Sequence, residues 1–122
     1  IVSDHIPEDE ESKRLSFSQA ATGAIGIETL LPLALEMHHN ESLPLNKIIE
    51  TLTINPAKIL QINKGTLAKG SDGDICILDL DAPWVVEAEK LKSKSKNTAI
   101  EGRKLQGKIL MTFLNGELVF NQ

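Results

Sequence analysis

The spacing of apolar residues divides the chain into a helical first half and a strand-rich second half. Between Ile27 and His39 the apolar side chains recur at helical spacing, which predicts an amphipathic helix with a broad apolar face. Pro32 lies within the first turns of that helix, where a missing backbone N–H costs little. A second, shorter helix is predicted over residues 45–52, directly after Pro44.

A third helix is predicted to begin at Asn55-Pro56, with Asn55 as the N-cap and Pro56 in the first helical position. It is expected to run to about Ile62 and to stop at residues 63–65. Beyond this point glycines separate short extended segments, so the boundary between the two halves is placed at residues 63–66.

Extended segments are predicted in the second half of the chain. Residues 74–80 form an apolar run typical of a strand, and residues 84–86 form a second extended piece. An Asn-Gly pair at 115–116 interrupts the apolar run of residues 108–120. Because both central residues of the favoured two-residue turn adopt positive φ, this pair predicts a β-hairpin.

The opening residues add a strand end and a charged loop. Residues 1–3 are predicted to end a buried parallel strand, and the carboxylate of Asp4 follows them. Residues 8–14 are mostly charged and are predicted to form a loop. This layout suits a β/α barrel, where chemistry occurs at the C-terminal ends of strands. Since the chain opens within a strand and without Met, we expect it to be a piece of a longer protein.

Composition and charge exclude several classes of protein. The 122 residues, 41% hydrophobic and 25% charged, are typical of a soluble domain. A net charge of −4 argues against a nucleic-acid surface, and no apolar run approaches the length of a membrane span. The single cysteine, Cys76, excludes an internal disulfide and fits a reducing, cytoplasmic compartment. Cys76 is expected in the core and Trp84 is expected to be a packing anchor.

Four blocks of sequence resemble the C-terminal third of dihydroorotases, which belong to the amidohydrolase superfamily. The blocks are residues 3–7 (SDHIP), 23–33 (GAIGIETLLPL), 52–60 (LTINPAKIL) and 93–98 (SKSKNT). The resemblance covers essentially the whole chain. The Glu28-Thr29 pair and the last block best distinguish dihydroorotases from dihydropyrimidinases and allantoinases, which open other cyclic amides.

The resemblance implies an α/β fold. Residues 1–63 would supply the last strand, the active-site loop and the helices of a metal-dependent amidohydrolase β/α barrel, and residues 64–122 the C-terminal part of a small β-sandwich. It also implies one or two zinc ions, held by a His-x-His pair, further histidines, a carboxylated lysine and a late aspartate. Of these ligands only the aspartate is present, as Asp4, and the others are expected before Ile1. The implied reaction interconverts dihydroorotate and carbamoyl aspartate in pyrimidine biosynthesis. The isolated chain is expected to be inactive.

Asp4 is the expected catalytic residue and a metal ligand. Hydrolysis of an amide needs a base for the proton of the attacking group and an acid for the leaving nitrogen, and one carboxylate beside the zinc can do both. Without the family resemblance, Asp4 would be interpreted as a turn or N-cap aspartate.

The substrate-binding positions depart from the family. Dihydroorotases commonly read Asp-His-Ala-Pro-His here, and the last histidine binds the substrate carboxylate, but this chain has Ile6 and Glu8. A glutamate repels a carboxylate, so Glu8 is a doubtful substrate contact and is expected in the solvated loop. Thr22 and Gly23 match a Pro-Gly whose backbone contacts the substrate, and glycine permits that close approach. An ordinary loop glycine is the alternative.

The remaining histidines and lysines have structural interpretations. His5 is expected to be hydrogen-bonded behind the site rather than to bind metal. His38 and His39 point about 100° apart on a helix, so they cannot easily share an ion, and they are expected to cap the helix C-terminus. The lysine-rich run of residues 92–96 is expected to lie against the barrel.

Different functions remain open. The chain could be part of an active dihydroorotase, which Asp4 favours. It could instead belong to a dihydroorotase-like scaffold without chemistry that serves a partner such as aspartate carbamoyltransferase, which Glu8 and Thr22 favour. A third possibility is another cyclic amidohydrolase, of the dihydropyrimidinase or allantoinase type. In each case the chain is expected to bind the rest of its parent or itself through strand edges and the helix after Ile27.

Overall fold

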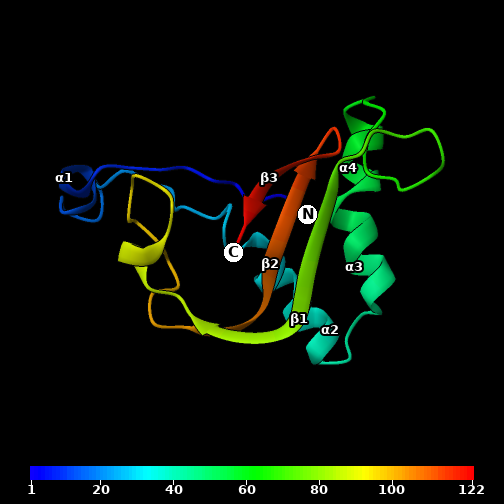
Figure 1. The fold of residues 1–122 in the computed structure, drawn as a ribbon. Helices are drawn as coiled ribbons and strands as arrows, with labels where there is room; N and C mark the ends of the chain where they lie inside the picture. Colours follow the sequence, from blue (N-terminus) through cyan, green and yellow to red (C-terminus); the bar gives the residue numbers. More distant parts are fainter.

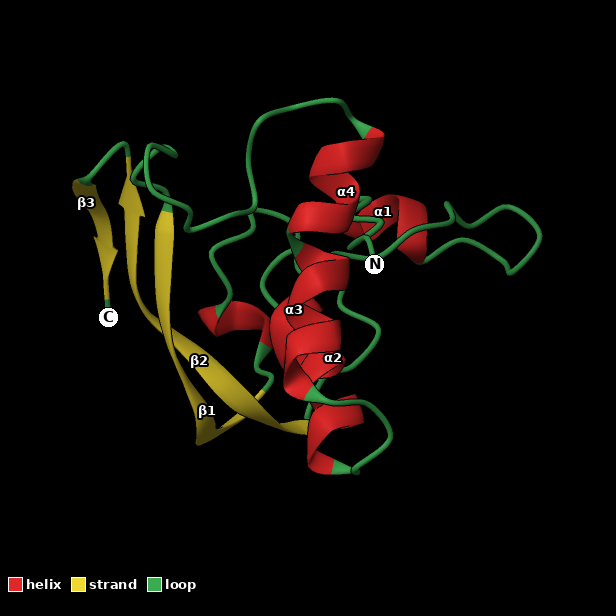
Figure 2. Ribbon diagram, turned by 90° about the vertical axis from the view of Figure 1, so that its right-hand side faces the viewer, coloured by secondary structure: helices red, strands yellow, loops and turns green.

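A computed structural model describes all of residues 1–122 and separates a helical part from a three-stranded sheet (Figure 1). The elements are α1 (Glu10–Lys13), α2 (Leu30–His39), α3 (Leu45–Leu52), α4 (Ile54–Ile59), β1 (Ile75–Val85), the 3-10 turn η1 (Ala88–Lys90), β2 (Lys104–Leu114) and β3 (Glu117–Asn121). Figure 2 shows the sheet on one side of the molecule and α2, α3 and α4 on the other. No helix combines the length and the apolar character needed to cross a bilayer.

Helix α2 confirms the main helix expected from the sequence but begins at Leu30, later than the apolar pattern predicted. Residues 26–29 form a turn in which the N–H of Thr29 donates to Gly26 O at 3.3 Å. Pro32 therefore occupies the third helical position, where its missing N–H removes no intrahelical bond. Leu35 is completely buried and fixes the inner face of α2.

Helix α3 has the predicted bounds, whereas the prediction for α4 was wrong at both ends. Thr53 ends α3 and is also the N-cap of α4, so Asn55 lies inside the helix instead of capping it. The helix stops at Ile59 because Gln61 adopts a φ of +56°, which a helix cannot continue.

The sheet has the order β1-β2-β3 and is antiparallel throughout. The predicted hairpin is confirmed, with φ of +51° at Asn115 and +82° at Gly116. The two extended pieces expected in residues 74–86 form one strand, β1, whose register is irregular between Asp79 and Pro83. There the Asp79 carboxylate accepts the N–H groups of Asp81 at 2.9 Å and Ala82 at 3.1 Å, which stabilises the bulge.

A hydrophobic core lies where the helical part meets the end of the sheet at which β1 ends and β2 begins. It consists of the buried side chains of Ile25, Val86, Leu91 and Leu105, with Leu33, Trp84 and Ile100 packed against them. Trp84 is thus a packing anchor, as expected, and its indole N–H donates to Gly107 O at 3.1 Å.

Other expectations were wrong. Residues 1–3 form no strand, and the nearest pairing is an isolated parallel bridge between His5 and Ala24. The charged segment at 8–14 contains helix α1 and is not a simple loop. Cys76 is exposed, because β1 presents apolar side chains that no other layer of residues 1–122 covers. The division into two domains at residues 63–66 stays a prediction.

Candidate active site

Asp4 is one of four residues other than glycine that adopt a positive φ. Its φ is +46°, in the left-handed region that few residues other than glycine adopt. This conformation costs about 1–2 kcal/mol in an L-residue, although Asp and Asn tolerate it best. The residue is exposed, in a segment without regular secondary structure. Strain of this kind collects at functional sites, where the surrounding structure must enforce it.

His5 provides part of that surrounding structure. Its Nδ1 atom accepts the N–H groups of Gly26 at 3.0 Å and of Ile27 at 3.4 Å. Beside it, the N–H of Ile6 donates to Ala24 O at 2.9 Å. Since the Nδ1 lone pair faces backbone donors, that atom cannot bind a metal, and His5 has the structural role that we expected.

The turn at Thr22 and Gly23 is adjacent to the segment that follows Asp4. Gly23 has a φ of +129°, and a Cβ atom there would lie 2.5 Å from Ile6 Cγ2. Only a glycine therefore fits this close approach. The structure thus brings the predicted substrate-binding turn beside the predicted catalytic segment, although their roles remain predictions.

Glu8 is half-buried and lies at the start of the charged segment that was expected to be solvated. Its backbone is hydrogen-bonded at both ends: the N–H donates to Asn97 Oδ1 at 3.3 Å, and the carbonyl accepts from the Ser95 hydroxyl. These bonds orient the main chain of Glu8. A contact between Glu8 and substrate stays a prediction.

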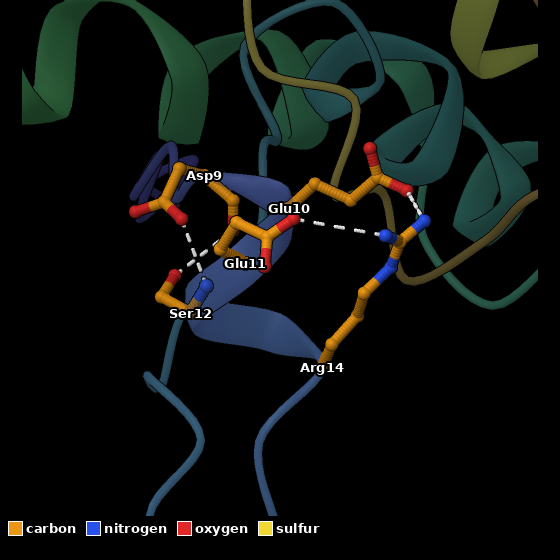
Figure 3. A network of polar contacts seen from close by, with 5 residues as sticks. All are labelled: Asp9, Glu10, Glu11, Ser12 and Arg14. Carbon is orange, nitrogen blue, oxygen red and sulfur yellow. Dashed lines mark hydrogen bonds and ion pairs between the residues drawn. The ribbon is translucent and has the colours of Figure 1, made fainter.

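Helix α1 follows Glu8 and is stabilised by its own polar residues (Figure 3). The Asp9 carboxylate accepts the Ser12 N–H at 2.8 Å, and this hydrogen bond lowers the pKa of Asp9. Arg14 pairs with Glu10 and Glu11, but these exposed ion pairs contribute little to stability.

A loop of residues 92–98, which contains the lysine-rich run, is bound to the helical part. The Glu28 carboxylate accepts the N–H groups of Lys92 at 2.9 Å and Ser93 at 3.0 Å. Figure 1 shows this loop (yellow) beside the blue segment that leads to α1. The start of the run therefore lies against the residues before α2, and its contact with a barrel stays a prediction. The residue that the sequence analysis missed is Asn97, whose only signal was its place in the last of the four blocks.

The metal ligands implied by the resemblance do not come together in this chain. No group of three or more His, Cys, Asp or Glu side chains is placed to bind a metal ion. His38 and His39 lie in the last turn of α2 with ring centroids 5.6 Å apart, and His39 Nε2 is buried without a hydrogen-bond partner. His39 Nε2 therefore does not cap the helix, contrary to expectation. The residues present do not by themselves fit a zinc site.

The chain is similar in sequence to proteins named dihydroorotase. It is 42% identical over 120 residues to the dihydroorotase of Ehrlichia chaffeensis, covering 98% of this chain and 27% of that protein. It is also 42% identical over 119 residues to the dihydroorotase of Geotalea daltonii, covering 98% and 28% respectively. The chain therefore spans little more than a quarter of the length of these curated relatives.

The solved structures that resemble the chain are hydantoinases and dihydropyrimidinases. The L-hydantoinase (dihydropyrimidinase) of Arthrobacter aurescens superimposes with a TM-score of 0.78 at 36% identity, over 85% of this chain and 24% of that one. A D-hydantoinase superimposes with a TM-score of 0.83 at 27% identity, over 93% and 25%. The amidohydrolase family model matches residues 1–119. The chain belongs to the amidohydrolase family.

Proposed function

We propose that this chain is part of a dihydroorotase and contains its late catalytic aspartate, Asp4. The complete protein would hydrolyse dihydroorotate to N-carbamoyl-aspartate and catalyse the reverse cyclisation in de novo pyrimidine biosynthesis. The main support is the conformation of Asp4, which is exposed at a φ of +46° beside the Gly23 turn. The 42% identity to a dihydroorotase supports this substrate class.

In this proposal Asp4 transfers a proton. Its carboxylate accepts the proton of the attacking water and returns it to the amide nitrogen as the ring C–N bond breaks. We propose that the left-handed backbone of Asp4 and the hydrogen bonds of the neighbouring His5 side chain hold the Asp4 carboxylate in its exposed position, where substrate can reach it.

The proposed metal is zinc, one or two ions, with Asp4 as the contribution of this chain. A catalytic zinc site needs about three protein ligands, so the others must come from residues outside 1–122. For the same reason we propose that the isolated chain is inactive. Its partners would be the rest of its parent chain, a second copy, or a subunit such as aspartate carbamoyltransferase. The proposed location is the cytoplasm.

Substrate would approach the turn at Thr22 and Gly23, where the missing side chain of glycine leaves room for Ile6. Thr22 is exposed, and Gly23 O is hydrogen-bonded to Lys13 Nζ at 3.0 Å. Glu8 is not proposed to bind the substrate carboxylate, because two negative groups repel each other.

A second candidate is a hydantoinase or dihydropyrimidinase activity. The observation that favours it is the superposition on the L-hydantoinase (dihydropyrimidinase) of Arthrobacter aurescens at 36% identity. The two candidates share Asp4 and differ in substrate. Dihydroorotate carries a carboxylate that hydantoin and dihydrouracil lack.

The test is the substrate preference of the complete protein that contains this segment. We would measure kcat/KM for dihydroorotate, dihydrouracil and hydantoin after supplying zinc. Dihydroorotate is expected to be the preferred substrate, and the isolated residues 1–122 should show no turnover. A preference for hydantoin or dihydrouracil would replace the first candidate with the second, and no turnover of any of the three would favour the scaffold.

A further inference from the structure

The side chain of Asn97 connects two segments that the proposed function places in the active site. Its Oδ1 atom accepts the N–H of Glu8 at 3.3 Å. Its Nδ2 atom lies 3.3 Å from Ile6 O and 3.3 Å from Gly23 O and donates to both. One amide group from the distant 92–98 loop therefore joins the segment after Asp4 to the Gly23 turn.

Both hydrogens and the oxygen of this amide are used, which fixes its orientation. If the amide were reversed, Oδ1 would face two carbonyl oxygens and Nδ2 would face a backbone N–H. The Ser95 hydroxyl lies 2.6 Å from Oδ1, but its single hydrogen is donated to Glu8 O, so Ser95 does not determine the orientation of the amide. No other natural side chain of this length offers one acceptor and two donors in the same plane.

The main chain of the 92–98 loop strengthens the connection. The N–H of Ile25 donates to Asn97 O at 3.3 Å, so residue 97 holds the stretch after Gly23 as well. At the other end of the loop, Glu28 accepts from Lys92 and Ser93 at 2.9 Å and 3.0 Å. The loop is thus fixed at both ends to residues 23–28, and Asn97 extends from it to residues 6–8.

We propose that Asn97 is a positioning residue of the active site, whose amide sets the separation between the Asp4 segment and the Gly23 turn. This inference rests on the proposed function of Asp4 and Gly23. Asn97 does not touch the reacting atoms. It acts through the carbonyl of Gly23, which orients the turn, and through Ile6 and Glu8, which keep the chain after Asp4 in place.

The test compares Asn97→Asp with Asn63→Asp in the complete protein. Asn97→Asp keeps the shape and one acceptor but places a negative oxygen against the Ile6 and Gly23 carbonyls. Asn63 is exposed in a loop, so its variant is the matched control for the added charge. Asn97→Ala is the second variant, because it removes the amide without adding charge.

We expect Asn97→Asp and Asn97→Ala to lower kcat/KM for dihydroorotate by about 10²-fold, as for a misplacement of about 1 Å. Part of this loss should be a rise in KM, since the Gly23 turn is proposed to contact substrate. Partial unfolding would lower kcat and leave KM unchanged. Asn63→Asp should retain wild-type values.

Amide hydrogen exchange gives a readout that does not depend on the reaction. Exchange should become faster in residues 5–8 and 22–26 of both Asn97 variants, with β1 and β2 unaffected. If the wild-type protein does not hydrolyse dihydroorotate, the proposed function fails, and this exchange pattern still decides whether Asn97 holds the two segments. Wild-type kcat/KM in the Asn97 variants of an active enzyme, or unchanged exchange in both segments, would overturn the proposal.

Discussion

Around Asp4 and Gly23 the chain is held by side-chain hydrogen bonds between distant residues, whereas the three strands are held by a backbone ladder. Asn97 and Glu28 each bond to segments more than 60 positions away in sequence. Strands β1 and β2 pair along most of their length, yet the outer strand β3 has every residue exposed. Directional bonds therefore position the candidate site, whereas the strands pair with one another but leave apolar side chains exposed.

This difference indicates what each region requires of its surroundings. The polar contacts near Asp4 are satisfied within residues 1–122, so that region carries its local geometry with it. The sheet leaves apolar side chains such as Ile77, Val119 and Phe120 open to solvent at 44%, 57% and 40%. An open apolar sheet with an unpaired edge favours association.

The largest expected effect is at Asp4 in the complete protein. Asp4→Asn keeps a side chain that tolerates the left-handed backbone but removes the base, so kcat should fall by about 10² to 10⁴-fold. Asp81→Asn, an exposed aspartate in the β1 bulge, is the control. If Asp4→Asn retains more than about a tenth of wild-type kcat, Asp4 is not the base.

A variant at Gly107 would test how closely α2 packs against strand β2. A Cβ atom at this buried residue would lie 2.5 Å from Leu35 Cδ1, and its φ is +106°. Gly107→Ala should therefore lower the free energy of unfolding by about 1–3 kcal/mol through overpacking, in addition to backbone strain. Urea denaturation measures this difference.

Gly102→Ala is the matched control for that measurement. Gly102 also has a positive φ, +75°, but nothing lies within 4 Å of an added Cβ. Its variant should show the backbone strain alone. Equal destabilisation by the two variants would show that the contact with Leu35 of α2 does not add to the cost of a side chain at residue 107.

The open sheet should make isolated residues 1–122 self-associate. Val119→Lys replaces an exposed apolar side chain on the outer strand with a charge that disfavours edge pairing. It should shift the chain toward monomer in sedimentation equilibrium at tens of micromolar. Asn121→Lys adds the same charge without removing apolar surface and should act less. A wild-type chain that is monomeric at this concentration would contradict the prediction.

The sequence predicted regular elements better than their junctions. Helix α3 and the Asn115-Gly116 hairpin follow from local patterns, because helical periodicity and positive φ are properties of neighbouring residues. Helix α4 was misplaced because Thr53 serves two helices, which no single-helix pattern shows. Cys76 was placed in the core because an apolar run does not reveal whether a second layer covers it.

The candidate site shows the same limit. Asp4, Thr22 and Gly23 were identified through the family resemblance, and the structure places their segments together. The role of Asn97 depends on the spatial meeting of residues 6–8, 23–25 and 97, which are separated along the chain. Spacing in sequence carries no information on such a contact.

The smallest expected effect concerns the ion pairs that fix the hairpin end of the sheet. Asp74 Oδ1 accepts the Asn115 N–H at 2.9 Å and Asp74 Oδ2 contacts Lys64 Nζ at 2.6 Å, and these contacts lower the pKa of Asp74. Lys64 also contacts Asp72 at 2.6 Å, and Asp72 and then Asp74 raise the pKa of Lys64. Both carboxylates and the amine remain half-exposed, so each contribution is small.

The pH dependence follows from the directions of these shifts. Because the pKa of Asp74 is lower in the folded chain than its ordinary 3.8, its contribution is present above that value and is lost as the pH falls through the lowered pKa. Because the pKa of Lys64 is raised above 10.5, its contribution is present below that value and is lost as the pH rises through the raised pKa. The stability difference between the wild type and Asp74→Asn, measured by urea denaturation, should therefore be larger at neutral pH than in strong acid. Asp81→Asn is the control for the loss of an exposed carboxylate that has no ion pair. A difference for Asp74→Asn that stays constant into strong acid would show that the hairpin end is held by the backbone ladder alone.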